Sequence, residues 1–394
     1  MNGFFLTLRR WLPLFGLTVA TFVFNTTEFI PIGLLSDIGR SFGIGEAQTG
    51  LLISVYAWMV ALLSLPLMML AARVPYRRLL LGTVAFFVLC HVASGFASSF
   101  GMLMASRIGV ACTHAIFWSI VSPIAVRIAP QGKDAVALGM ILGGSSIAMI
   151  VGLPLGRAIG LHLGWRASFF GIAGCAAALF LLLLCCFPNV APQKQQSFRF
   201  GELLRRKSLM VLNIFTLLLV TAHYTAYSYI EPFLAQAAHI SDHAITVSLM
   251  VFGLAGIISS VLFSLAFRRY AGLFALLPVA GITCLLLGLP LFAASFLSIA
   301  LLCVLWGMCI TTFNLVAQTT VLHYAPKDTT LAMAMYSGIY NVGIGLGSVI
   351  GGRVESQMSV GCIGYVGGGI ALLALAFYAL SLRPYTRELC ARRS

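Results

Sequence analysis

The segment PNVAPQKQQSFRFGELLRRKS, residues 188–208, is the longest polar break in a chain otherwise built of apolar runs. It is basic and contains two prolines, which is typical of a linker between helix bundles. Six apolar runs precede it and six follow, and a helix needs about 20 such residues to cross a bilayer. The sequence therefore predicts an all-α membrane protein with a six-helix bundle at 1–187, a cytoplasmic linker at 188–208, and a second, pseudo-symmetric six-helix bundle with a short tail at 209–394.

The composition excludes several classes of protein. Of the 394 residues, 60% are hydrophobic and 9% are charged, whereas soluble domains are about 45–50% apolar and about 25% charged. A soluble globule with so few charges could not cover its surface, so a soluble enzyme, a disordered protein and a coiled coil are excluded. The expected membrane-spanning helices are 11–36, 47–72, 79–99, 101–127, 136–160, 166–187, 209–234, 244–267, 271–292, 295–322, 330–352 and 361–382.

The basic residues predict the orientation in the membrane. The chain has 24 Lys and Arg against 10 Asp and Glu, and most of the cations fall in alternate loops. If both termini are cytoplasmic, the outside loops hold only Arg40, Arg157, Arg166 and Arg353. Cytoplasmic loops of membrane proteins are enriched in Lys and Arg. We therefore expect cytoplasmic termini, and the net positive charge requires no nucleic-acid partner.

The two halves repeat a pattern of small residues. Glycines recur at four-residue spacing in the fifth and the eleventh expected helices, and small residues at this spacing let helices approach closely. The repeated positions are Gly152, Gly156 and Gly160 in the first half and Gly343, Gly347 and Gly351 in the second. A duplication of six helices with an even total is typical of a transporter whose substrate site lies between the repeats.

Several stretches in both halves resemble a known family. They are FNTTEFIPIGLLSDI (24–38), SVYAWMVALLSLP (54–66), SRIGVACTHAIFWSI (106–120), GLPLGRAIG (152–160), TAHYTAYSYIEPF (221–233) and SGIYNVGIG (337–345). The chain resembles the major facilitator superfamily in its drug:proton antiporter branch, and more closely the bacterial SotB-type sugar efflux transporters. This resemblance implies proton-coupled sugar export across a bacterial inner membrane. The loop motif that normally contains an Asp reads MLAARVPYRR (69–78) and has no acid, so the family's cytoplasmic charge relay is not carried over.

One acid stands out because it lies within an expected span. Glu28 follows roughly 17 apolar residues, and Asn25 precedes it by one turn on the same face. An ionised side chain at the centre of a membrane helix costs about 2.5–3.5 kcal/mol, so such a carboxyl group suits a site that takes up and releases a proton. The alternative is an acid at the outer interface, with the helix ending near Pro31.

Arg107 is the natural counter-charge for Glu28. It lies about two turns into the fourth expected helix, at the position of the intramembrane Arg of the family that the chain resembles. Helical spacing places His114 two turns further on the same face, and Trp118 one turn beyond. We expect Glu28, Arg107 and His114 to carry proton coupling. His91, in the third expected helix, shows no partner in the pattern and is assigned no role.

The seventh expected helix supplies a second polar stripe. His223, Tyr227 and Glu231 follow one another at four-residue intervals, with Tyr224 beside them, and Pro232 ends the helix. Glu231 lies nearer the outer surface, where it is expected to be a gate residue or a simple interfacial acid.

Neutral polar residues complete the expected substrate site. These candidates are Asn25, Trp118, His223, Tyr224, Tyr227, Glu231, Asn314, Gln318, Tyr340 and Asn341, with Tyr336 beside the last two. Amides and phenols without a positive cluster argue against an anionic substrate, and aromatic rings with hydroxyl-binding groups suit sugars. The alternative is that these side chains join helices to one another.

The sequence thus predicts a proton-coupled exporter of sugars or sugar-like molecules that works by alternating access. A multidrug exporter of lipophilic compounds is the alternative. A membrane enzyme is disfavoured because no metal-ligand spacing and no nucleotide-binding glycine loop occurs, and a channel because no filter segment recurs. The expected partners are a sugar-like substrate, protons and the lipid bilayer, and we expect a monomer without a metal or cofactor.

Overall fold

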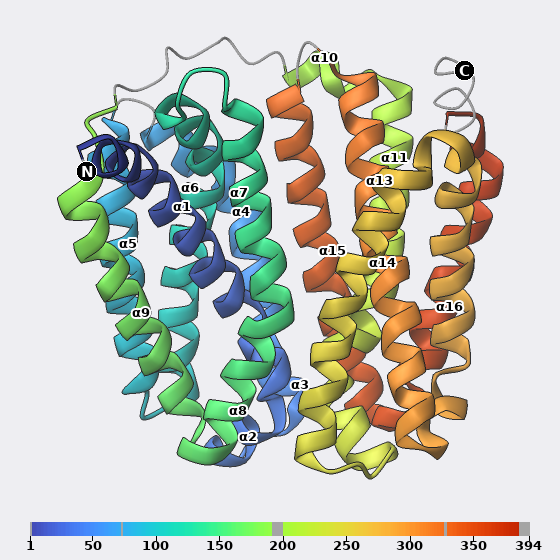
Figure 1. The fold of residues 1–394 in the computed structure, drawn as a ribbon. Coiled ribbons are helices and arrows are strands. Elements are labelled where there is room, and N and C mark those ends of the chain that lie inside the picture. Colours follow the sequence, from blue (N-terminus) through green and yellow to red (C-terminus); the bar gives the residue numbers. More distant parts are fainter. Residues whose placement is uncertain (1, 72–73, 191–199, 327–328, 386–394) are drawn as a thin grey trace. The chain divides into compact units, whose positions relative to one another are not determined.

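The computed structural model describes residues 2–71, 74–190, 200–326 and 329–385, and every regular element in these ranges is helical (Figure 1). Within these described ranges, twelve helices are long and apolar enough to cross a membrane, which confirms the predicted number. The helices of the first part are α1 (Asn2–Gly33), α2 (Leu35–Phe42), α3 (Glu46–Thr49), α4 (Leu51–Ala71), α5 (Tyr76–Gly95), α6 (Phe100–Ile128), α7 (Asp134–Ile147), η1 (Ala148–Gly152), α8 (Leu153–Leu163) and α9 (Trp165–Cys186). Those of the second part are α10 (Phe200–Leu204), α11 (Lys207–Tyr227), α12 (Ile230–Pro232), η2 (Phe233–Ala237), α13 (Asp242–Leu287), η3 (Leu289–Ala294), α14 (Phe296–Tyr324), α15 (Thr329–Gln357), η4 (Val360–Cys362), α16 (Ile363–Phe377) and η5 (Tyr378–Leu382).

The contacts divide the chain into two compact units. Unit 1 comprises Met1–Leu34 and Met59–Gln196, and unit 2 comprises Leu35–Trp58 and Ser197–Ser394. In unit 1, α1 packs against α7, α8 and α9, and in unit 2, α11 packs against α15 and α16 (Figure 1). The segment Leu35–Trp58 belongs to the first half of the sequence but packs with unit 2. Part of the predicted linker, residues 191–199, lies outside the described residues.

The seventh span ends earlier than the sequence predicted. We expected a continuous helix over 209–234, but α11 ends at Tyr227 and Glu231 lies in the separate short helix α12. Pro232 explains the position of the break, because its ring would clash with the carbonyl of residue 228 in a continuous helix. The expected stripe at four-residue intervals therefore ends at Tyr227.

The repeated glycines pack alike in the two units. In unit 1, a Cβ added at Gly156 would collide with Ile30 of α1, and in unit 2, a Cβ added at Gly347 would lie 2.6 Å from the carbonyl oxygen of Thr221 in α11. At Gly347 the obstacle is backbone, so a larger side chain would force α15 away from α11, whereas at Gly156 the side chain of Ile30 would have to move. The predicted close approach is thus confirmed at these positions, in each case against the first spanning helix of its half.

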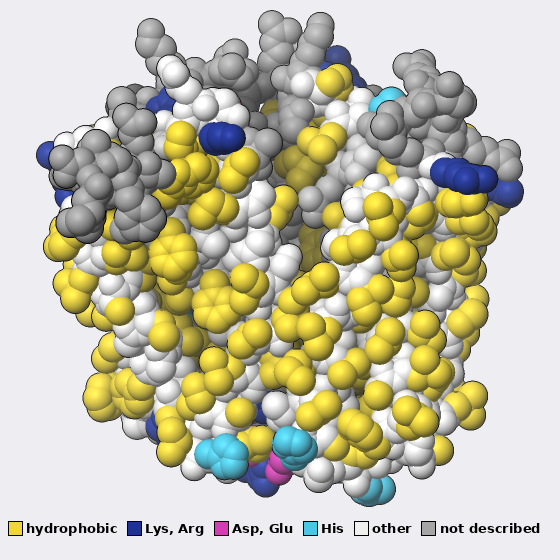
Figure 2. Space-filling model, in the orientation of Figure 1, with side chains coloured by type: hydrophobic (Ala, Val, Ile, Leu, Met, Phe, Trp, Pro, Cys, Tyr) yellow, Lys and Arg dark blue, Asp and Glu magenta, His cyan; other side chains and the backbone are white. Residues whose placement is uncertain are grey.

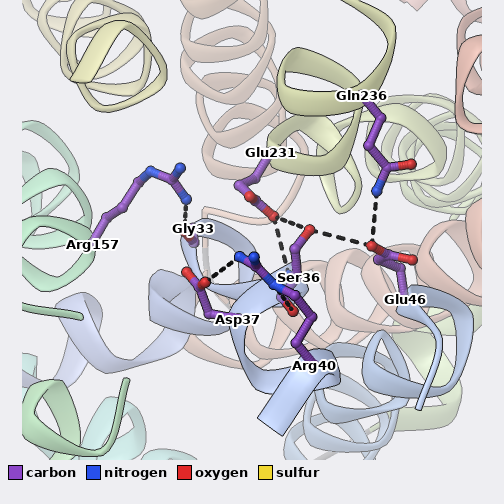
Figure 3. Close-up of polar contacts among 8 residues, drawn as sticks. All are labelled: Gly33, Ser36, Asp37, Arg40, Glu46, Arg157, Glu231 and Gln236. Atoms are coloured by element: carbon purple, nitrogen blue, oxygen red, sulfur yellow. Dashed lines mark hydrogen bonds and ion pairs between the residues drawn. The ribbon is translucent and has the colours of Figure 1, made fainter. Parts of the chain in front are cut away.

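One arginine lies elsewhere than expected. The sequence placed Arg157 in an outside loop, but it lies within α8 and is fully buried. Its guanidinium donates a hydrogen bond to the carbonyl of Gly33 (Figure 3). The burial of Arg157 is explained by the end of α1 at Gly33, because the last carbonyls of a helix lack an intrahelical donor and attract cations.

The surface of the helices is apolar. Figure 2 shows hydrophobic side chains across the middle of the helices and Lys and Arg side chains near their ends. Leu89, Leu265 and Leu380 are among the exposed ones, with 65%, 77% and 83% of their surface accessible. Such exposure is unfavourable in water and favourable against lipid, so the chain is a multi-pass membrane protein. The cytoplasmic location of its termini stays a prediction.

Candidate substrate and proton-coupling sites

The charged site lies inside unit 1, where α1 and α6 bring three predicted residues together. Nε2 of His114 lies 3.9 Å from Oε2 of Glu28, and their side chains are 1% and 19% exposed. The guanidinium of Arg107 is close enough to interact electrostatically with both. The predicted proton-coupling residues are therefore neighbours in the folded unit.

Arg107 is anchored to α1 beside the acid. Its side chain is 1% exposed, and its NH1 group donates hydrogen bonds to the carbonyl oxygen of Thr27 (3.1 Å) and to the Thr27 hydroxyl (3.3 Å). These bonds hold the guanidinium against α1 at the residue before Glu28.

His91 extends this network and has partners on α1 and in its own helix that the sequence pattern did not show. Its Nε2 lies 2.6 Å from the Thr27 hydroxyl, and its Nδ1 lies 2.8 Å from the carbonyl oxygen of Phe87. A carbonyl only accepts, so Nδ1 carries a proton, and the Thr27 hydroxyl donates to Nε2 of the neutral ring. The chain of donors therefore runs from Arg107 through Thr27 and His91 to Phe87. The sequence did not reveal it, because helical spacing relates residues within a helix and says nothing of partners on another.

Aromatic rings surround the charged site. Phe24 stacks on Phe87 and Phe117 with ring centroids 4.2 and 4.1 Å apart, and it lies 5.2 Å from the ring of His114. All three phenylalanines are fully buried. Apolar surroundings strengthen electrostatic interactions by lowering the local dielectric, so the rings increase the effect of a change in the charge of Glu28.

The remaining predicted residues of unit 1 lie apart from this network. Nδ2 of Asn25 makes a long contact of 3.5 Å with the carbonyl oxygen of Ser145 in α7. Trp118 is 36% exposed and meets Phe117 edge to face. Among the described residues, neither side chain is hydrogen-bonded to Glu28, Arg107 or His114.

Unit 2 contains an aromatic cluster around His223. The imidazole stacks on Tyr227, with centroids 5.0 Å apart and an interplanar angle of 19°, and Tyr227 stacks on Phe252 of α13 at 4.8 Å. Nε1 of Trp306, on α14, donates a 3.0 Å hydrogen bond to Nδ1 of His223. Phe252 and Trp306 were not among the predicted site residues. The one available signal was the position of Trp306 in mid-span, since a buried tryptophan usually needs an acceptor for its N–H.

A second polar group in unit 2 joins α14 to α15. Nδ2 of Asn314 donates to the hydroxyl of Tyr340 at 3.2 Å, and the hydroxyl of Tyr336 donates to Oδ1 of Asn314 at 2.9 Å. Because the amide nitrogen donates to one partner and the amide oxygen accepts from the other, these two bonds fix the orientation of the Asn314 side chain. The ring of Tyr340 also lies 6.5 Å from that of Tyr224, edge to face, which connects this group to the aromatic cluster.

The two remaining predicted amides of unit 2 are Asn341 and Gln318. Nδ2 of Asn341 donates to the carbonyl oxygen of Ser337 in its own helix, and the side chain is 9% exposed. Gln318 is half-buried, and no hydrogen bond joins it to another side chain within the described part of the chain.

Glu231 joins α12 to α2 in unit 2 rather than extending the stripe of α11. Its Oε2 accepts hydrogen bonds from the backbone N–H of Ser36 (3.2 Å) and from the Ser36 hydroxyl (3.0 Å), and its side chain is 3% exposed. Figure 3 shows Ser36 between Glu231 and Glu46, whose Oε1 also accepts from Gln236 at 2.8 Å. Glu231 therefore holds two segments of unit 2 together.

Comparison with known proteins gives the family. The sequence-family model of the Major Facilitator Superfamily matches residues 17–330 of this chain. A bacterial homologue of the human lysosomal transporter Spinster is similar in structure, with a TM-score of 0.66, 16% identity, and coverage of 98% of this chain and 95% of that one. The human organic anion transporter MFSD10 (TETRAN) is similar with a TM-score of 0.66 and 16% identity over 94% of this chain and 99% of that one. At such identities these structures support the fold, and the family match supports transport of a small molecule rather than catalysis. The chain belongs to the Major Facilitator Superfamily.

Proposed function

We propose that this transporter exports sugars or sugar-like small molecules in exchange for protons. The observation that carries the proposal is the group of Glu28, Arg107 and His114 inside unit 1, with His114 and Arg107 buried and Glu28 half-buried. An ionisable group inside a membrane span is expensive and is usually kept for ion or proton movement. The resemblance of both halves to SotB-type exporters supports the outward direction and the sugar substrate.

Protonation changes the balance of charge around Arg107. An ionised Glu28 attracts the guanidinium, whereas a protonated Glu28 does not. The hydrogen bonds from Arg107 to Thr27 hold the cation in place in both states. A proton that binds Glu28 therefore changes the free energy of unit 1 and can shift the population between conformations. Release of the proton to the cytoplasm would reset the transporter.

The substrate class is supported by the neutral groups of unit 2. The ring of His223 is surrounded by Tyr224, Tyr227, Phe252 and Trp306. Aromatic faces accommodate the C–H surfaces of sugars, and hydroxyl, amide and imidazole groups bind their hydroxyls. A neutral, hydroxyl-rich molecule fits this chemistry better than an ion does.

A multidrug exporter is the second candidate, because the same rings could bind lipophilic compounds. Competition separates the two functions. In proteoliposomes that carry the purified protein, lactose- or arabinose-like sugars should inhibit transport of a dye substrate if sugars are carried. Dye transport that no sugar affects would favour the multidrug function.

The test of proton coupling compares two transport modes in proteoliposomes. Counterflow needs only substrate exchange, whereas gradient-driven transport needs coupled protons. We expect Glu28→Gln to keep counterflow and to lose gradient-driven transport by at least about tenfold, or about 1.4 kcal/mol. Asp134→Asn, which changes an exposed acid in the first turn of α7 in the same way, is the control and should retain both modes. Full gradient-driven transport by Glu28→Gln would refute the proposal.

A further inference from the structure

The indole of Trp306 determines which nitrogen of His223 carries a proton. An indole N–H only donates hydrogen bonds, and Nε1 of Trp306 lies 3.0 Å from Nδ1 of His223. Nδ1 must therefore offer its lone pair. In the neutral imidazole the proton is then on Nε2.

Packing prevents the ring from turning over. His223 is 2% exposed and Trp306 is fully buried. The imidazole stacks on Tyr227 and meets Trp306 at 89° and Tyr224 at 79°. A flipped ring would place a carbon against the indole N–H, and an unpaired buried donor costs about 1–3 kcal/mol. The observed orientation is therefore the stable one.

The surroundings also disfavour a charged ring. An imidazolium carries N–H groups on both nitrogens, so its Nδ1–H would point at the N–H of Trp306. The ionisable side chains packed around His223 and Tyr227 are Tyr224, Cys303 and Tyr340, and phenols and thiols are ordinarily neutral at pH 7. No ion pair joins His223 to a carboxylate within the residues that the structure describes.

One donor remains for a ligand. Nε2 of His223 makes no hydrogen bond to any residue that the structure describes, whereas Nδ1 is occupied by Trp306. The fixed Nε2–H matches an acceptor such as a sugar hydroxyl or ring oxygen. It offers nothing to an ammonium group, which only donates.

We propose that Trp306 is a positioning residue that holds His223 as a permanent Nε2–H donor, and that this donor selects neutral, acceptor-bearing substrates over amines. The selection of substrates rests on the proposed function, whereas the state of the imidazole does not. His223 then binds substrate without carrying protons, and coupling stays with unit 1.

The test measures directly which nitrogen of the His223 imidazole carries a proton. The full-length protein is labelled with ¹⁵N-histidine, and the signal of His223 among the seven histidines is assigned by its loss in His223→Gln. We expect the wild-type ring to show a protonated Nε2 and an unprotonated Nδ1 from pH 5 to pH 8. A proton on Nδ1, or titration of the wild-type ring in this range, would overturn the proposal.

Variants then test the role of the indole. Trp306→Phe keeps an aromatic ring but removes the donor, so the Nε2–H signature should give way to mixed tautomers, and the KM for sugar counterflow should rise about tenfold, the loss of roughly one hydrogen bond. Trp118→Phe, in unit 1, should leave the His223 signal unchanged. An unaltered signal in Trp306→Phe would contradict the proposal. If the wild-type protein carries no sugar at all, the proposed function fails, while the wild-type spectrum still decides the state of His223.

Discussion

Both units bury histidines in spanning helices, and His91 of unit 1 and His223 of unit 2 have different hydrogen-bond partners. His91 in unit 1 donates from Nδ1 to a backbone carbonyl and accepts at Nε2 from Thr27, which also binds Arg107. His223 in unit 2 accepts at Nδ1 from Trp306. His91 is the last side chain of a hydrogen-bond network that includes the positively charged Arg107. His223 lies among uncharged aromatic rings.

The difference suggests a division of roles between the units. If Glu28 takes up a proton as proposed, the charge near the guanidinium of Arg107 changes and the network in unit 1 responds. An aromatic cluster around a fixed donor does not respond in this way and suits recognition of a neutral molecule. The helix packing is similar in the two units, so the distinction lies in the polar side chains.

The largest expected effect comes from removing the cation of unit 1. Arg107→Gln leaves Glu28 without its counter-charge and Thr27 without a charged donor, so gradient-driven transport should fall about 100-fold, or about 2.7 kcal/mol. Transport in proteoliposomes under a pH gradient measures the effect. Arg166→Gln is the matched control, because Arg166 also donates to a backbone carbonyl in unit 1, that of Ala97 at 2.9 Å. Similar losses of gradient-driven transport in both variants would show that Arg107 has no special role in coupling.

A substitution that disturbs helix packing should lower the stability of the protein, whatever role each unit has in transport. Gly347→Val forces a side chain against the backbone of α11, and overpacking of this kind costs about 1–3 kcal/mol of stability. The midpoint of thermal unfolding in detergent should fall. Gly338→Val, on the same helix with open space at its Cβ position, should change it much less, and equal shifts would contradict the close contact of α11 and α15.

A smaller effect is expected when the chain of donors in unit 1 is broken at its centre. Thr27→Val keeps the shape of the side chain but leaves Nε2 of His91 without a donor, so gradient-driven transport should fall about tenfold, consistent with the cost of an unpaired buried polar group. Thr27→Ser should preserve it. Thr21→Val is the control, since the hydroxyl of Thr21 donates to Leu17 in its own helix and bonds to no other residue that the structure describes. A fully active Thr27→Val would show that His91 has no part in coupling.

The smallest effect is expected in unit 2. Tyr336→Phe removes the hydroxyl that orients the amide of Asn314, and we expect the KM for counterflow to rise about fivefold, close to the value of one buried hydrogen bond. Proton coupling, measured as the ratio of protons to substrate, should stay unchanged. Tyr365→Phe, at a position that is 55% exposed, should change neither quantity. A changed ratio in Tyr336→Phe would show that unit 2 also takes part in coupling.

The sequence predicted those features that depend on spacing within a helix. The twelve spans follow from the lengths of apolar runs, and the approach of Gly156 and Gly347 to neighbouring helices follows from the four-residue repeat. The proximity of Arg107 and His114 follows from their spacing on one face of α6. Their proximity to Glu28 was inferred from the need of a buried acid for a counter-charge, and the structure places the three together.

Most side-chain partners on other helices could not be predicted from spacing within one helix. The partners of His91 and of His223 lie on other helices, and no periodicity within a helix identifies them. Arg157 was counted with the outside loops, yet it is buried within α8, where the carbonyl of Gly33 accepts a hydrogen bond from it. Pro232 marked a break in the seventh span, but its effect falls one turn earlier, at residue 228, because proline disturbs the carbonyl four positions before it.

The most direct test of proton coupling through unit 1 measures proton movement during substrate flow. Proteoliposomes that contain sugar and a trapped pH indicator are diluted into sugar-free buffer of the same pH, so that outward sugar flow is the sole driving force. We expect the wild-type lumen to become acidic as protons enter in exchange for sugar. Glu28→Gln, which exchanges sugar in counterflow, should leave the lumen pH constant. Acidification by Glu28→Gln equal to that of the wild type would show that Glu28 does not couple protons to sugar flow.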